Sequence, residues 1–332
     1  MILTVTPNPS LDRTYEVPAL DRGEVLRATA ERMDPGGKGV NVSRALAAAG
    51  HRTVAIVPLG GAPGALVAEL LTGQGIEVAP VPVKGSTRSN IALAEPDGTL
   101  TKINAPGPEL SASEAESLLA AVSAVASAAA ASAVSAIAAR SASAAWIACC
   151  GSLPRGLAPE WYAKLVTRAH AAGARVALDT SGPSLLAALR SRPDVVKPNA
   201  DELAQAVGRP LATVGDAVKA AEELRGLGAG AVLASLGADG QLLVSSAGTF
   251  YGHARVTAVR SNVGAGDASL AGFLAAGGGG PEALSAAVAH GAAAVQLPGS
   301  VMPKPADLDS SAVTVTADIP LDRVLTEQGS PR

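Results

Sequence analysis

The stretch Ser261-Asn262-Val263-Gly264-Ala265-Gly266-Asp267 runs directly into the apolar helical pattern Ala268-Ser269-Leu270-Ala271-Gly272-Phe273-Leu274. A loop of small residues at a helix start leaves backbone N–H groups unpaired at the positive end of the helix dipole. The stretch therefore predicts an anion site, in which Gly264, Ala265 and Gly266 supply amides and Asp267 accepts a proton from a substrate hydroxyl. Two simpler interpretations stay open: a first-turn helix charge for Asp267 and a tight turn for Gly-Ala-Gly.

Strand-like runs alternate with helical patterns along the rest of the chain. The runs cover residues 2–6, 54–58, 76–83, 145–149, 175–179, 195–197 and 231–235. This alternation predicts an α/β fold with a mostly parallel central sheet and helices on both faces. Such sheets bind ligands at the carboxyl ends of their strands. Polar residues and glycines follow the runs there, at Asn8, Gly151-Ser152, Asp179, Asn199 and Gly237.

Two segments interrupt the alternation, at about residues 12–33 and 86–104. Each contains short polar–apolar alternations and a turn signal, Asp21-Arg22-Gly23 in one and Pro96-Asp97-Gly98 in the other. They could pair as a small antiparallel sheet that forms a lid, and the lid could double as a homodimer contact. Surface hairpins without a function are the alternative.

Composition excludes several classes of protein. The chain has 332 residues, 48% hydrophobic and 17% charged, with a net charge of −3, which is typical of a soluble globular protein and gives no attraction to nucleic acid or membrane. Adjacent Cys149 and Cys150 in apolar surroundings indicate buried thiols. We see no signal peptide before the first strand and expect a cytoplasmic protein.

An Ala/Ser-rich segment covers residues 111–145, with no charge between Glu116 and Arg140. Alanine and serine gain too little on leaving water for a transmembrane helix. Ser111 and Glu114 form a capping-box pattern, so we expect a long helix packed on the sheet. Near the end of the chain, residues 312–316 resemble a strand, and we expect residues 326–332 to be a disordered tail.

A second glycine-rich turn precedes a helical pattern at Asp34-Pro35-Gly36-Gly37-Lys38-Gly39-Val40-Asn41-Val42-Ser43-Arg44. Lys38 and Asn41 lie about one turn apart and could face one ligand. The turn is not a phosphate-binding Walker A loop, because Gly39 follows Lys38 where Ser or Thr should stand. It is not a dinucleotide fingerprint either, because Val42 occupies the third glycine position.

Six motifs in order resemble those of the ribokinase-like, PfkB-type carbohydrate kinases. They are Thr6-Pro7-Asn8-Pro9-Ser10-Leu11-Asp12-Arg13, Gly36-Gly37-Lys38-Gly39-Val40-Asn41, Gly151-Ser152-Leu153-Pro154, Lys197-Pro198-Asn199-Ala200-Asp201-Glu202, Ser235-Leu236-Gly237-Ala238-Asp239-Gly240 and Gly264-Ala265-Gly266-Asp267. The first two are most similar to the branch that contains 1-phosphofructokinases and tagatose-6-phosphate kinases.

The resemblance implies a three-layer α/β/α fold with a small antiparallel β lid, in one kinase domain over residues 1–325. It implies that ATP phosphorylates a ketohexose phosphate, with fructose 1-phosphate as the first expectation. Tagatose 6-phosphate, fructose 6-phosphate and an unphosphorylated sugar or nucleoside stay open as substrates. A sugar-phosphate sensor without activity is the alternative from another class, and an intact Asp267 counts against it.

The resemblance also implies residue roles in the sugar half of the site. Asp12 and Asn41 would bind sugar hydroxyls, although Asp12 could be only a turn former. Gly36 and Gly37 would let the backbone approach the sugar closely. Lys38 and Arg88 would hold the phosphate that the substrate already carries. Arg88 could instead be a solvated strand charge, and Asn104 is a further candidate contact.

In the nucleotide half, the resemblance implies Mg²⁺ and ATP. Asn199 and Glu202 would order Mg²⁺ through its waters, with Glu202 as the indirect metal residue; Asn199 could equally be only a helix cap. The remaining residues implied for ATP are Lys197, Ser235, Gly237, Gly240, Gly264 and Gly266. Two departures stand out, Asn262-Val263 in the anion loop and Ala105 after Asn104.

Overall fold

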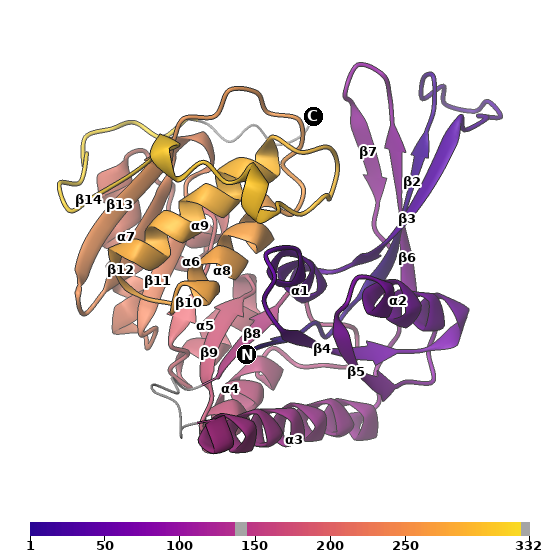
Figure 1. Cartoon of the computed structure of the whole chain (residues 1–332), viewed down its shortest axis with the longest axis horizontal. Helices are drawn as coiled ribbons and strands as arrows, with labels where there is room; N and C mark the ends of the chain where they lie inside the picture. The colour runs from indigo at the N-terminus through magenta and orange to yellow at the C-terminus, as the bar shows by residue number, and fades with distance from the viewer. Residues whose placement is uncertain (137–144, 327–332) are drawn as a thin grey trace.

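The computed structural model describes residues 1–136 and 145–326, and its main feature is a ten-stranded sheet (Figure 1). Its strand order is β14-β13-β12-β11-β10-β9-β8-β1-β4-β5. The parallel strands confirm the predicted runs: β1 Ile2–Val5, β4 Thr53–Leu59, β5 Glu77–Pro82, β8 Trp146–Cys150, β9 Arg175–Asp179, β10 Val195–Val196 and β11 Ala231–Ser235.

One edge of the sheet is antiparallel, formed by β12 Gln241–Ser245, β13 Gly248–Ala254 and β14 Val313–Thr316. The predicted strand at residues 312–316 is therefore confirmed. Strands β12 and β13 were not predicted. Their short hairpin turn and the glycines of β13, Gly248 and Gly252, hide the alternation that marks a strand.

Helices cover both faces of the sheet and give the predicted three layers (Figure 1). Four of them pack on one face: α1 Lys38–Ala48, α2 Gly61–Gly73, α8 Ala265–Ala275 and α9 Gly280–Val295. Five pack on the other: α3 Ala112–Ala136, α4 Trp161–Ala171, α5 Gly182–Leu189, α6 Ala200–Val207 and α7 Val214–Gly226. Three short 3₁₀ turns lie at Gly237–Asp239, Pro305–Asp307 and Ser310–Ala312.

A second sheet projects from the main body as the predicted lid (Figure 1). Its order is β3-β2-β6-β7, with β2 Ser10–Glu16, β3 Ala30–Gly36, β6 Arg88–Ala94 and β7 Leu100–Ile103. The predicted antiparallel lid is confirmed for the pairs β2–β3 and β6–β7, whereas β2 and β6 pair in parallel. Both strands leave the main sheet from parallel strands, β1 and β5, and so enter the lid in the same direction.

The Ala/Ser-rich segment forms α3 as far as Ala136, and its residues 137–144 lie outside the described part of the chain. The predicted capping box is present, because the Ser111 amide donates to Glu114 Oε2 over 2.8 Å and the Glu114 amide donates to Ser111 Oγ over 3.3 Å. Leu118, Leu119 and Val122 are buried on the inner side of the helix. Within residues 1–136 and 145–326, none of the helices combines the length and apolarity of a transmembrane span.

The two cysteines and the end of the chain complete the comparison with the sequence. Cys149 and Cys150 are buried free thiols, as predicted. The amide of Thr326 donates to Asp239 Oδ2 over 2.6 Å, so the chain is still docked at a residue predicted to belong to the disordered tail. Residues 327–332 lie outside the described residues.

Candidate active site

A cavity of about 530 Å³ lies where the glycine-rich turns, the strand ends and the lid meet. The sequence placed nine of its lining residues in the site: Asp12, Gly37, Lys38, Asn41, Arg88, Asn104, Glu202, Gly264 and Asp267. These residues come from both halves of the chain. The fold therefore brings most of the predicted sugar half together with the predicted base.

Gly264 begins the anion loop as the N-cap of α8, with a φ of 78° that favours glycine. The amides of Gly264, Ala265, Gly266 and Asp267 donate to no acceptor within the described residues. They are the free N–H groups of a helix start, which can bind an anion. This confirms the predicted geometry of the loop.

Asp267 lies in the first turn of α8 and its side chain is buried. Burial raises the pKa of Asp267 to about 6, and repulsion from Asp179 adds to the rise. Lys197, the hydrogen bond from Asn41 and Lys38 act in the opposite direction. A base with a pKa just below neutrality is ionised at pH 7 and still basic enough to accept a proton.

Asn41 contacts Asp267 directly, because its Nδ2 donates to Asp267 Oδ2 over 2.9 Å. The sequence predicted that Asn41 binds sugar hydroxyls. Asn41 does line the cavity, but one of its donors is already used to hold the carboxylate of Asp267. Its role as a positioning group for Asp267 was not predicted.

Lys38 bridges two carboxylates at the start of α1. Its Nζ lies 2.7 Å from Asp179 Oδ1 and 3.3 Å from Glu202 Oε1. Burial would lower the pKa of Lys38, but the charges of Asp179 and Glu202 outweigh it and raise that pKa above its ordinary value. The predicted grip on a substrate phosphate would compete with these two ion pairs.

Asp179, at the end of β9, also pairs with Lys197, whose Nζ lies 2.8 Å from Asp179 Oδ2. Burial would raise the pKa of Asp179, but Lys197 and Lys38 together hold it below its ordinary value. The sequence placed Asp179 at a ligand-binding strand end without assigning it a role. The structure makes it the carboxylate that joins two cations of the site.

Asn199 and Glu202 form a complete capping box on α6. The Glu202 amide donates to Asn199 Oδ1 over 2.8 Å, and the Asn199 amide donates to Glu202 Oε2 over 2.9 Å. The helix-cap interpretation of Asn199 is therefore confirmed. Among the residues that the structure describes, no group of three or more His, Cys, Asp and Glu side chains could hold a metal ion.

Asp12 lies on the lid strand β2, which excludes the turn-former interpretation. Its Oδ1 accepts hydrogen bonds from Ser10 Oγ over 2.6 Å and from Asn90 Nδ2 over 2.9 Å. A Cβ at Gly36 would collide with the Asp12 carboxylate, so glycine is required there. Gly37 has a φ of 114°, which also favours glycine.

Arg88 begins β6 and holds two backbone carbonyls. Its Nη1 donates to Ala105 O over 3.0 Å and its Nη2 donates to Asn8 O over 2.9 Å. It is partly buried and lines the cavity, so the interpretation as a solvated strand charge is wrong. The guanidinium therefore connects the lid to the loop at Asn8, which leads into β2.

The pfkB family carbohydrate kinase model matches residues 6–307, which is most of the chain. The chain belongs to the pfkB carbohydrate kinase family. A 1-phosphofructokinase of Rhodobacter capsulatus is 39% identical over 95% of this chain and 96% of its own length. Another of Bacillus subtilis is 32% identical over 83% of this chain and 85% of its own length.

Solved structures agree with the family. Phosphofructokinase-2 from Escherichia coli, in complex with potassium, has a TM-score of 0.82 and 33% identity, and the match covers 92% of this chain and 96% of that chain. An Arabidopsis thaliana ribokinase has a TM-score of 0.70 at 24% identity, which supports the fold alone. The expected ribokinase-like fold and pfkB membership are thus confirmed.

Six residues predicted for ATP in this pfkB kinase do not line the cavity: Lys197, Asn199, Ser235, Gly237, Gly240 and Gly266. Lys197 is buried against Asp179, Ser235 ends β11 and forms a bridge with Asn199, and Gly237 begins the 3₁₀ turn that follows. A Cβ at Gly240 would lie 2.5 Å from Gly252 O, so close packing on β13 accounts for that glycine.

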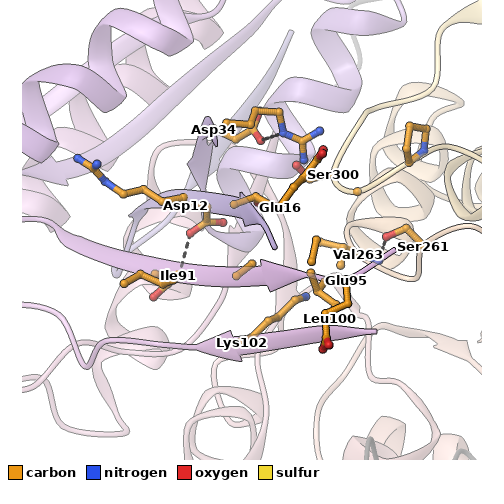
Figure 2. A pocket seen from close by; sticks show the side chains of 18 of the residues that line it. Asp12, Glu16, Asp34, Ile91, Glu95, Leu100, Lys102, Ser261, Val263 and Ser300 are labelled. Carbon is orange, nitrogen blue, oxygen red and sulfur yellow. Dashed lines mark hydrogen bonds and ion pairs between the residues drawn. The ribbon is translucent and has the colours of Figure 1, made fainter. Parts of the chain in front are cut away.

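A second cavity of about 460 Å³ lies between the inner face of the lid and the loops at residues 260–263 and 298–300 (Figure 2). Residues of all four lid strands line it. Lys102 on β7 lines both cavities, and its side chain has no hydrogen-bond or ion-pair partner among the described residues. In Figure 2 it projects from the lid toward the loop that carries Val263.

The sequence analysis missed Lys102. Burial lowers its pKa, and Asp12 opposes this effect. A signal was present in the sequence, because Lys102 lies two residues before the candidate Asn104 and strand residues two apart share a face. Among the described residues its ammonium group has no partner, so it is free to bind an anion.

Proposed function

We propose that this protein transfers the γ-phosphoryl group of ATP to fructose 1-phosphate, forming fructose 1,6-bisphosphate and ADP. The observation that carries the proposal is that its pfkB relative named 1-phosphofructokinase matches 95% of the chain at 39% identity. The site supports this reaction, because a buried carboxylate lies beside unpaired helix-start amides. These are the two parts that phosphoryl transfer requires of a protein.

In this mechanism Asp267 accepts the proton of the attacking hydroxyl as its oxygen forms a bond to the γ-phosphorus. The bond between that phosphorus and the oxygen bridging to the β-phosphate breaks, and ADP leaves. The amides of Gly264, Ala265 and Gly266 stabilise the negative charge of the transferring group. Asn41 keeps Asp267 oriented through their 2.9 Å hydrogen bond.

The lid would select the phosphorylated sugar. Lys102 would bind the substrate phosphate, with Arg88 and Lys38 close by and Asn104 as a further contact. Asp12 would accept a sugar hydroxyl next to the backbone of Gly36 and Gly37. Because Lys102 has no partner among the described residues while Lys38 and Arg88 already have partners, it is the strongest candidate for the phosphate contact.

On the nucleotide side, Lys197, Ser235 and Gly237 would contact the phosphates of ATP, and Gly240 would shape the same turn. Mg²⁺ would supply charge neutralisation for these phosphates. It keeps most of its waters, so Glu202 and the amide group of Asn199 fit an outer-shell role better than direct ligation.

The lid also supports the proposal of a homodimer. On it, Ile103 is 58% exposed and Met33 is 38% exposed, and apolar surface of this kind favours a protein contact. Replacing Ile103 with Asp should then shift the mass measured by light scattering toward the monomer. An unchanged mass in that variant would argue against this contact. A cytoplasmic location remains part of the proposal.

The experiment measures ADP release with MgATP and, in parallel, fructose 1-phosphate, tagatose 6-phosphate, fructose 6-phosphate and free fructose. Asp267→Asn is the control. A preference for fructose 1-phosphate that disappears in the variant supports both the substrate and the base. If another sugar is preferred, the substrate assignment fails and the kinase assignment stands. Binding of ATP and sugar phosphate without any ADP release would support the sensor alternative.

A further inference from the structure

Arg44 is a buried cation that the reaction above does not use. It lies on α1, three residues after Asn41, and its relative exposure is 8%. It lines neither cavity. A buried guanidinium is costly unless its donors find acceptors, so its partners indicate why it is there.

The guanidinium of Arg44 contacts three different elements. Nη1 donates to Asn41 Oδ1 over 3.3 Å on α1, and Nη2 lies 3.4 Å from Asp34 Oδ1 on the lid strand β3. Nε donates to Gln74 Oε1 over 3.2 Å at the end of α2. Arg44 is therefore in contact both with the lid and with the residue that holds Asp267.

The contact with Asn41 decides which way its carboxamide faces. The group has one acceptor oxygen and one NH₂ donor. Because Arg44 donates to the oxygen, the NH₂ is turned toward Asp267 and donates over 2.9 Å. With the amide reversed, its oxygen would face the carboxylate of Asp267, and two acceptors would repel each other.

We propose that Arg44 is a positioning residue, which keeps Asn41 turned to donate to Asp267 and makes this orientation depend on the lid through Asp34. The inference rests on the proposed role of Asp267 as the base. A hydrogen bond to a carboxylate favours its ionised form, the form that accepts a proton. Arg44 would thus control how much of the base is ready at a given pH.

Other charged and titratable groups also face Asp267 and must be considered. Lys38 comes from α1, Cys150 from the end of β8, Asp179 from β9 and Lys197 from the end of β10. On α9, which packs on α8, His290 lies against Gly272, one turn and a half further along the helix. None of these groups touches the Asn41 carboxamide oxygen, which Arg44 alone contacts among the described side chains. The charge of Arg44 also acts on Asp267 directly, and Arg44→Lys keeps that charge.

The lid is connected to Arg44 through Asp34 on β3. The second oxygen of Asp34 forms an ion pair with Arg32 Nε at 2.8 Å, so Asp34 is held to its own strand as well as to Arg44. A movement of β3 would change the distance between Asp34 and Arg44, and with it the freedom of Arg44 to hold Asn41. Closure of the lid over a sugar and ionisation of Asp267 would then be linked.

The test titrates Asp267 in the unliganded protein by NMR of carboxyl-labelled aspartate, with Asp267→Asn to identify its signal. Arg44→Met should raise the pKa of Asp267 by at least about 0.5. The acid limb of kcat/KM should move to higher pH by the same amount. Arg44→Lys should raise the pKa of Asp267 less than Arg44→Met does, because the lysine ammonium can still donate to an acceptor.

Two further variants test whether the pKa of Asp267 depends on the contacts from Asp34 through Arg44 to Asn41, or on any disturbance of Arg44. Asp34→Asn should shift the pKa of Asp267 in the same direction by a smaller amount. Gln74→Ala removes the third partner of Arg44 and should leave that pKa in place. A shift of equal size in Gln74→Ala would overturn the proposed route, since any disturbance of Arg44 would then suffice.

An unchanged Asp267 pKa in Arg44→Met, with only a lower melting temperature, would show that Arg44 is merely structural. If Arg44→Met does not fold, Arg44→Lys and Asp34→Asn decide the matter, and no shift in either overturns the proposal. The titration does not require catalysis, so its result does not depend on the proposed activity. Failure of the proposed base is seen separately, as normal turnover in Asp267→Asn.

Discussion

The ammonium group of Lys38 lies 2.7 Å from Oδ1 of Asp179, so one ion pair joins the glycine-rich turn at residues 34–44 to the middle of the main sheet. Asp179 is fully buried and also pairs with Lys197. Its negative charge repels Asp267, whose pKa is raised to about 6 by burial and, after it, by Asp179. The pair thus affects the base as well as the fold.

Replacing Asp179 with Asn should lower the pKa of Asp267, because the repulsion disappears while Lys38 and Lys197 keep their charges. The acid limb of kcat/KM should then move to lower pH, opposite to the shift expected for Arg44→Met. Stability should fall, because two partly or fully buried ammonium groups lose their shared partner. A pH–rate profile checks this, with Asp194→Asn as a charge-removal control, since the Asp194 carboxylate accepts from the Val176 amide at the other end of β9.

Removal of the base should stop the chemistry while leaving binding largely intact. Asp267→Asn should lower kcat by at least about 10²-fold, the low end of general-base effects. In the unaltered protein, kcat/KM should fall as the pH drops below about 6, because protonated Asp267 cannot accept a proton. Steady-state kinetics and calorimetry check both statements, and near-normal turnover of the variant would remove Asp267 from its role.

Lys102 and Arg88 should differ in what their loss affects. Lys102→Met should raise KM for the sugar phosphate far more than KM for ATP, with the melting temperature unchanged, because Lys102 has no partner in the described structure. Arg88→Ala should raise KM for the sugar phosphate too, but it should also lower the melting temperature, because two backbone carbonyls lose their donor. Equal effects of Lys102→Met on both KM values would argue against a phosphate contact.

Gly36 and Gly73 form a matched pair of glycines. Gly36→Ala should displace Asp12, because the added Cβ would collide with its carboxylate, and KM for the sugar should rise strongly. Gly73→Ala, at the end of α2 with nothing within 4 Å, should leave kinetics alone and stabilise the fold by roughly 0.5 kcal/mol. Kinetics and thermal unfolding of both variants check this. An equal KM for the sugar in the two variants would show that substrate binding does not depend on the position of Asp12.

Tyr162 tests the support beneath the cavity. Its buried hydroxyl donates to Gly151 O over 2.8 Å, and Gly151 lines the cavity. Tyr162→Phe should lower the free energy of unfolding by about 1–2 kcal/mol, because the carbonyl loses a buried donor. Urea unfolding measures the loss, and an unchanged midpoint would show that another donor, such as water, replaces the hydroxyl.

Much of the fold was predictable because it depends on local patterns. The parallel strands, the long helix after Ser111 and the two lid segments follow from periodicity and turn residues, and each is present. The parallel pairing of β2 with β6 was not predictable, since the pattern of one strand does not reveal the direction of its neighbour. The same holds for β12 and β13, whose place between β11 and β14 is a matter of tertiary pairing.

The candidate site divides in the same way. The sequence by itself determined which residue types stand at strand ends and helix starts, and so identified Asp267, its amide loop and the glycines beside Asp12. Only the tertiary structure decided which of these side chains are free. Lys38 is shared between Asp179 and Glu202, and Asn41 between Arg44 and Asp267. Partners separated by more than a hundred residues meet only when the sheet and lid assemble, and hydrogen bonds and ion pairs act over a few ångströms.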